Sequence, residues 1–194
     1  MIGIEIDANQ IKRLGDAVSA SGKKLRKELA AAVNQTIKDG ELKIARDIGS
    51  EITMKIGDIK KTIRSPRKAT AVNPEGVIAL GWRKREGLQY FKAKQTKLGV
   101  TYKISKKAGR GIVRGAFMGP SPGVLSPKLY GGVFKRIGKS RLPIAKLRAV
   151  SAAGAFLKNK HEDALPGYLR ERLTHQIERR INLNVLRASG LVPK

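Results

Sequence analysis

The residues that most often carry out acid–base or metal chemistry are few in this chain. Glu162 and Asp163 are adjacent, so on a helix their carboxylates diverge and do not meet at one substrate atom. The two histidines, His161 and His175, lie 14 positions apart with no second cluster of ligands. The absence of cysteine excludes disulfides, thiolate metal ligands and cysteine nucleophiles. We therefore expect no catalytic residues, no metal site, no cofactor and no enzymatic activity.

One stretch invites comparison with phosphate-binding loops. Residues 132–140 read GVFKRIGKS, but the motif needs glycine, four residues and then Gly-Lys-Ser/Thr, and Val133 occupies the place of the first glycine. A helix must also begin at that lysine, whereas Pro143 follows three residues after Ser140 and favours an extended chain. We therefore reject this stretch as a nucleotide site.

Positive charge is the strongest feature of the sequence. The chain has 194 residues with 41 Lys+Arg against 15 Asp+Glu, a formal net charge of +26. Residues 61–160 hold 24 basic and 2 acidic side chains, so they supply +22 of that charge. Such a segment repels itself unless an anionic partner lies beside it. We expect that partner to present phosphates or an acidic protein surface.

The sequence offers little with which to read nucleotide bases. Aromatic residues make up only 5% of the chain, and no reading helix is evident. Contact with nucleic acid is therefore expected to be directed at phosphates, independent of sequence and steeply dependent on salt. The expected nucleic-acid or acidic-partner contacts are the basic side chains of the predicted strands and turns, namely Arg83, Lys84, Arg85, Lys103, Lys106, Lys107, Arg110, Arg114, Lys135, Arg136, Lys139 and Arg141.

Helices are expected near both ends of the chain. Residues 2–6 alternate as a short strand, a helix follows to about residue 19, and the apolar spacing from Leu25 to Ile48 predicts a longer helix. Gly40 weakens this helix without forbidding it. A short helix is expected over residues 58–63, before Ser65 and Pro66. A final helix is expected to begin near Leu165 and Pro166.

The middle of the chain is expected to form strands. Residues 77–82, 98–104, 111–118 and 133–137 read as strands, and residues 88–93 are expected to pair with 98–104 through a turn at 94–97. Residues 143–150 are expected to be an extended edge or connector. Residues 119–132 contain three prolines and four glycines, a long loop of the kind that is often functional.

Together these elements predict an α+β fold, with an antiparallel sheet flanked by a long N-terminal helix pair and a C-terminal helix. We expect a single domain over residues 1–194, with a helical part (1–66), a basic stranded part (67–150, including the loop 119–132) and a C-terminal helix (160–190). The apolar ridge of that last helix faces either the sheet or a neighbouring subunit. The residues expected at a subunit interface are Leu169, Leu173, Ile177, Ile181, Pro120, Pro122, Leu125 and Tyr130.

No apolar run approaches the roughly 20 residues of a membrane-spanning helix. The first residues also lack the basic and apolar regions of a signal peptide. We therefore expect no membrane partner and synthesis in the cytoplasm.

Two stretches resemble a known family. Residues 115–117 (GAF) and, after a hairpin-like return, residues 133–144 (VFKRIGKSRLPI) look like the signature of minor tail protein Z, a tail completion family of long-tailed phages. Related head–tail joining proteins share the signature more loosely. The order of a helical pair, basic strands and a final helix is also similar, over nearly the whole chain.

This resemblance implies a structural virion protein, made in the host cytoplasm, at the head-proximal end of the tail. Its implied partners are further copies of itself in a ring such as a hexamer, the tail tube or tail terminator protein, head–tail connector proteins, and genomic DNA contacted through phosphates. Members of the family are also associated with correct placement of the DNA end. We expect the side of the sheet that carries Lys103, Arg114 and Arg136 to face DNA or an acidic ring surface.

Two other classes of protein remain open. A sequence-independent RNA- or DNA-binding protein of the ribosome-associated type would explain the charge, but not the long apolar helices or the proline-rich loop. A peripheral membrane protein is disfavoured, because the basic residues lie on predicted strands and the helical stripes lack aromatic anchors.

Overall fold

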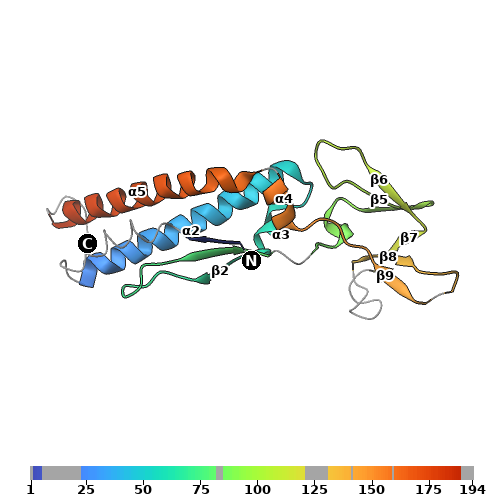
Figure 1. Cartoon of the computed structure of the whole chain (residues 1–194), viewed down its shortest axis with the longest axis horizontal. Helices are drawn as coiled ribbons and strands as arrows, with labels where there is room; N and C mark the ends of the chain where they lie inside the picture. Colours follow the sequence, from blue (N-terminus) through green and yellow to red (C-terminus); the bar gives the residue numbers. More distant parts are fainter. Residues whose placement is uncertain are drawn as a thin grey trace. The chain divides into compact units, whose positions relative to one another are not determined.

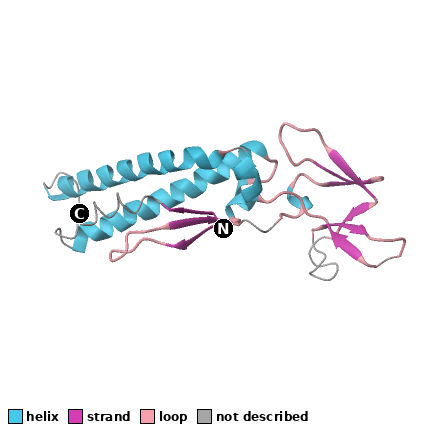
Figure 2. Ribbon diagram, in the orientation of Figure 1, coloured by secondary structure: helices cyan, strands magenta, loops and turns pink. Residues whose placement is uncertain are grey.

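The structure is a computed structural model that describes residues 2–5, 23–81, 85–120, 131–140, 142–158 and 160–188. These residues form mixed helix and antiparallel sheet, which confirms the α+β class in its coarse form. Instead of one sheet, they form three sheets of three strands each (Figure 2). The helix expected up to residue 19 and residues 121–130 of the expected loop lie outside the described residues.

The chain divides into two compact units. The helical unit comprises Met1–Ile44, Ile63–Leu80 and Lys160–Lys194, and the basic unit comprises Ala45–Thr62 and Gly81–Asn159. This division cuts across the parts expected from the sequence, because residues 67–80 group with the terminal segments and not with the later strands. The single domain over residues 1–194 stays a prediction.

Two long helices and a small sheet make up the helical unit. Helix α2 (Lys23–Glu51) follows the predicted apolar spacing and belongs to this unit as far as Ile44, and α5 (His161–Ala188) lies beside it (Figure 1). Strands β1 (Ile2–Glu5) and β2 (Ile63–Arg67) both pair antiparallel with β3 (Val77–Leu80), which lies between them.

The core of the helical unit lies where α2 meets α5 and β3. Val33, Ile37, Ile78 and Leu169 are all buried there. Gly40 sits at the closest approach, since a β-carbon at this position would lie 2.7 Å from Leu169 Cδ2 and 2.9 Å from Ile78 Cδ1. The sequence suggested only that Gly40 weakens the helix, whereas its small size lets three elements pack together.

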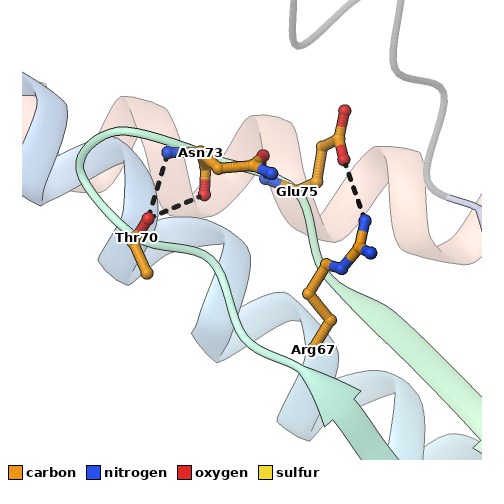
Figure 3. Close-up of polar contacts among 4 residues, drawn as sticks. All are labelled: Arg67, Thr70, Asn73 and Glu75. Atoms are coloured by element: carbon orange, nitrogen blue, oxygen red, sulfur yellow. Dashed lines mark hydrogen bonds and ion pairs between the residues drawn. The ribbon is translucent and has the colours of Figure 1, made fainter.

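The loop between β2 and β3 is closed by local polar contacts (Figure 3). The Thr70 N–H donates to the carbonyl oxygen of Asn73 (2.7 Å), and the Asn73 N–H donates to Thr70 Oγ1 (3.0 Å). Arg67 at the end of β2 lies 3.5 Å from the Glu75 carboxylate just before β3. A cation of this unit thus finds its counter-charge on the neighbouring segment.

The basic unit combines short helices with two small sheets. Its helices are the end of α2, α3 (Ile56–Lys60), the 3-10 turn η1 (Leu88–Tyr90) and α4 (Ala152–Lys158). One sheet has the order β4 (Lys94–Thr96), β5 (Gly99–Tyr102), β6 (Gly111–Arg114). The other has the order β7 (Ala116–Met118), β8 (Val133–Arg136), β9 (Ile144–Lys146).

A compact apolar cluster joins these two sheets. Leu88, Val100, Ala116 and Val133 are at most 4% exposed and form its centre. Val100 comes from the first sheet, whereas Ala116 and Val133 come from the second. Each sheet therefore has one face turned toward this cluster and one face turned away from it.

Several strand boundaries predicted from the sequence are wrong. Residues 88–93 do not pair with β5; η1 occupies their first half, and β4 over residues 94–96 is the partner. Leu98, the first residue of the strand expected over 98–104, lies in the β4–β5 turn and is 66% exposed. The strand expected over residues 111–118 is broken at Gly115, where a φ of +70° favours glycine.

The helix boundaries also differ from expectation. The helix expected over residues 58–63 is α3, which ends at Lys60, and Ile63 already begins β2. Helix α4 was not predicted. Helix α5 begins at His161, so Pro166 lies inside the helix and not at its start. Pro166 is the sixth residue of the helix and has no N–H to donate to the Glu162 carbonyl oxygen, so α5 lacks one main-chain hydrogen bond in its second turn.

Candidate polyanion-binding surface

Charge is distributed very unequally between the two units. The basic unit contains 23 Lys+Arg and 4 Asp+Glu, which gives +19 of the chain's +26. The helical unit contains 18 Lys+Arg and 11 Asp+Glu, which gives +7. A surface that binds a polyanion is therefore expected in the basic unit.

Most of the described cations predicted as contact residues are exposed to solvent. Lys103 is half-buried, and the exposed ones are Arg85, Lys106, Lys107, Arg110, Arg114, Lys135, Arg136 and Lys139. Arg83, Lys84 and Arg141 lie outside the described residues.

The β4–β5–β6 sheet carries cations on the face turned away from the core. Directly opposed residues share a face, and Val100 opposite Val113 marks the core side. The other face therefore holds Lys94, opposite Thr101, and Arg114, opposite Gly99. Arg110 joins them, because its guanidinium donates to the Lys92 carbonyl oxygen (2.7 Å) and to Thr101 Oγ1 (3.3 Å).

The β7–β8–β9 sheet carries a second group of cations, and here they lie over aromatic rings. Phe117 is opposite Phe134, and Phe134 is opposite Lys146, so these three share one face. The two rings stack with their centroids 6.0 Å apart. Arg136 Cζ lies 5.6 Å from the Phe117 centroid, and Lys146 Nζ lies 6.0 Å from the Phe134 centroid. Cation–π attraction at these distances holds both charged side chains against the sheet.

Lys103, Arg114 and Arg136 do not share one sheet as the sequence suggested. Arg114 is on β6 of one sheet, Arg136 is on β8 of the other, and Lys103 follows the end of β5. The main chain of Lys103 has a structural role, since its N–H donates to the Phe91 carbonyl and its own carbonyl accepts from Thr53 Oγ1.

The acidic groups of the basic unit neutralise few of its cations. Glu51 lies 3.8 Å from Lys107, and Asp58 lies 2.9 Å from Lys61. The hydrogen bond that Lys61 donates to Asp58, followed by the charge of that carboxylate, raises the pKa of Lys61. Among the described residues, Arg136 and Lys146 have no carboxylate within ion-pair distance.

The residues considered for chemistry stay apart. His161 and His175 both lie on α5, and a rise of about 1.5 Å per residue separates them by about 21 Å. Within the described ranges, no three His, Cys, Asp or Glu side chains gather as metal ligands would. Among the described residues, Lys139 lies between β8 and β9 and does not begin a helix. Residues 132–140 therefore lack the helix that a phosphate-binding loop requires. No described helix is long and apolar enough to cross a membrane.

The residues expected at a subunit interface divide into three groups. Leu169 and Leu173 are 2% and 7% exposed, so they contribute to the chain's own core and not to an accessible surface. Ile177 is half-buried and Ile181 is 45% exposed; both line a small groove of about 50 Å³ between α2 and α5. Pro120 is half-buried, whereas Pro122, Leu125 and Tyr130 lie outside the described residues.

Sequence reasoning missed several members of this surface. Lys92, Lys94 and Lys146 were not among the predicted contacts, and neither phenylalanine was connected with them. The signal for Lys146 was present in the alternation of residues 144–146, but it needed the pairing partner of β9 to be known.

Comparison of the chain with protein-family models, curated proteins and solved structures gave no match.

Proposed function

We propose that this chain is a structural protein of a phage virion that completes the head-proximal end of a tail and helps to join it to the head. The observation that carries the proposal is the separation of charge, with +19 in the basic unit against +7 in the helical unit. When subunits form a ring through which DNA passes, each subunit needs a cationic part that faces the genome. It also needs another part that maintains the assembly.

The resemblance of residues 115–117 and 133–144 to minor tail protein Z supports the same role. These stretches include Phe117, Phe134 and Arg136, which lie together on one face of the β7–β8–β9 sheet. The residues that carry the resemblance therefore also include the two stacked phenylalanines and the arginine that lies over one of them.

Contact through phosphates suits a conduit for DNA. Phosphate contacts are independent of sequence and weaken as salt rises, so they position a genome without locking one sequence in place. In a ring of identical subunits, the cations of all basic units would add around one channel. The proposed partners are further copies of the chain, the tail tube or terminator protein, the head–tail connector and the genome.

Negative-stain imaging of tails made with and without this chain tests the proposal. We expect an additional ring of density at one tail end when the chain is present, and free heads beside incomplete tails when it is absent. Complete tails and normal joining without the chain would contradict the proposal. Cosedimentation of the chain with ribosomes, together with unchanged tails, would support the RNA-binding alternative.

A further inference from the structure

We propose that Arg136 and Lys146, held over Phe117 and Phe134 on the outer face of the β7–β8–β9 sheet, form a fixed pair of contacts to the phosphate backbone of nucleic acid. This inference deepens the proposed function, because it assigns the DNA contact to one face and adds Lys146 to it.

Strand register places the two cations close together. Arg136 is opposite Ile144, and Lys146 is opposite Phe134, so the two charged residues are diagonal neighbours on adjacent strands. Diagonal neighbours of this kind are about 7–8 Å apart across a sheet. The opposite face of the same sheet carries Val133 and Ala116, which are buried in the core cluster. The pair therefore lies on the side turned away from that core.

The aromatic rings restrict both cations before any partner binds. Long basic side chains usually lose rotamer freedom on binding, and contact with a ring lowers this cost. Gly132 lets the arrangement close, because a β-carbon there would lie 2.6 Å from Phe134 Cε2 and 3.3 Å from Lys146 Cε. The lysine stem and the ring both lie against this glycine.

The chemistry of the face favours phosphates over bases. Phe134 is only 4% exposed, so its ring has almost no free surface on which a base could stack. Arg136 offers a planar fork that binds two phosphate oxygens, and Lys146 offers a compact point charge. Neither has a described carboxylate partner that a phosphate would have to displace.

A nucleic-acid backbone is favoured over an acidic protein surface because its charges repeat at regular intervals. Lys139 is also exposed, in the turn after β8, whereas Lys135 is opposite Ala116 and belongs to the other face of the sheet. A polyphosphate can pass from the fixed pair to Lys139 without any special order of side chains. Contacts of this kind contribute to affinity on every sequence alike.

The test is the salt dependence of DNA binding by the full-length chain. Fluorescence anisotropy would follow two labelled duplexes of unrelated sequence through a salt series, for the wild type and for the double variant Arg136→Gln and Lys146→Gln. Each lost phosphate contact lowers the slope of log K against log salt by about 0.9, so we expect the slope to fall by about 2 on both duplexes.

A charge-matched control separates this pair from net charge alone. Lys38→Gln with Arg170→Gln removes one lysine and one arginine from exposed positions of the helical unit. We expect this control to keep the wild-type slope. The variant Phe117→Leu keeps an apolar side chain beneath Arg136 but removes the aromatic ring, and we expect weaker binding with nearly the wild-type slope.

Three results would overturn the inference. The first is a double variant whose salt slope equals that of the wild type. The second is a change of slope on only one of the two duplexes. The third is a double variant that no longer binds poly-glutamate but binds DNA as the wild type does. The last result would assign the face to an acidic protein. These outcomes are independent of tail imaging, so failure of this inference is distinguishable from failure of the tail-completion role.

Discussion

The two compact units handle charge in different ways. In the helical unit 11 carboxylates accompany 18 cations, and cations such as Arg67 and Arg180 lie against carboxylates on other segments, 3.5 Å from Glu75 and 2.9 Å from Glu28. In the basic unit 23 cations share 4 carboxylates, and two of the cations are held over phenylalanine rings. The helical unit therefore offsets more than half of its cations with its own carboxylates, whereas the basic unit offsets fewer than one in five and is suited to an external anion.

The largest expected effect tests whether the ridge of α5 belongs to the core of the helical unit. Leu169→Ala removes a side chain that is 2% exposed, and we expect a loss of about 2–5 kcal/mol of stability. Amide hydrogen exchange should show faster opening of α2 and α5 and little change in β5 and β6. Ile181→Ala, at a position 45% exposed, is the control and should change stability by no more than about 0.5 kcal/mol. Equal effects of the two variants would show that the ridge is not buried as described.

The next effect concerns the close approach of α2 to its neighbours. Gly40→Leu forces a large side chain against Leu169 and Ile78, and we expect a loss of about 1–3 kcal/mol. Gly167→Ala is the matched helical control, because nothing lies within 4 Å of its β-carbon. Alanine there should stabilise α5 by about 0.5–1 kcal/mol. Thermal unfolding followed by circular dichroism measures both, and a stabilising Gly40→Leu would contradict the packing.

A smaller effect is expected for the ion pair that joins the two long helices. Glu28 and Arg180 are each a little over one quarter exposed, so solvent screens their attraction only in part. A double-mutant cycle with Glu28→Gln and Arg180→Gln should give a coupling of about 0.2–1 kcal/mol that decreases as salt is added. A coupling that does not depend on salt would show that packing, and not charge, joins these side chains.

The smallest effect has opposite signs in the two units. Salt screens the repulsion among the cations of the basic unit, so added salt should slow amide exchange in β5, β6 and β8. The same salt weakens the ion pairs of the helical unit and should slightly speed exchange in α2. Both changes are expected to be on the order of a few tenths of a kcal/mol. A change of the same sign in both units would remove the electrostatic contrast between them.

Long periodic segments were predictable from the sequence, because each signal is contained in one stretch. The apolar spacing of residues 25–48 gave α2, and period-two alternation around Val100 gave β5. Residues 88–93 are too short a segment to separate strand from helix, and the structure forms η1 over Leu88–Tyr90. The short, alanine-rich α4 has no clear polar face, which is why it was missed.

The candidate surface was predictable only in its chemistry. Counting charge along the chain identified Arg114 and Arg136 as candidate contacts to nucleic acid or an acidic partner, and both are exposed to solvent. Placing Lys146 beside Arg136 required the register between β8 and β9, which depends on residues about ten positions apart. Likewise, the close contact made at Gly40 depends on Leu169, far along the chain, so no local pattern could have predicted it.

Lysine footprinting by acetylation and mass spectrometry, with and without a duplex of random sequence, tests the central claim most directly. Lys38, Lys68 and Lys160 are exposed in the helical unit, and Lys94, Lys135, Lys139 and Lys146 are exposed in the basic unit. We expect DNA to protect the lysines of the basic unit while those of the helical unit react at their free rate. Equal protection in both units, or protection confined to the helical unit, would contradict the claim that the basic unit is the part that contacts a polyanion.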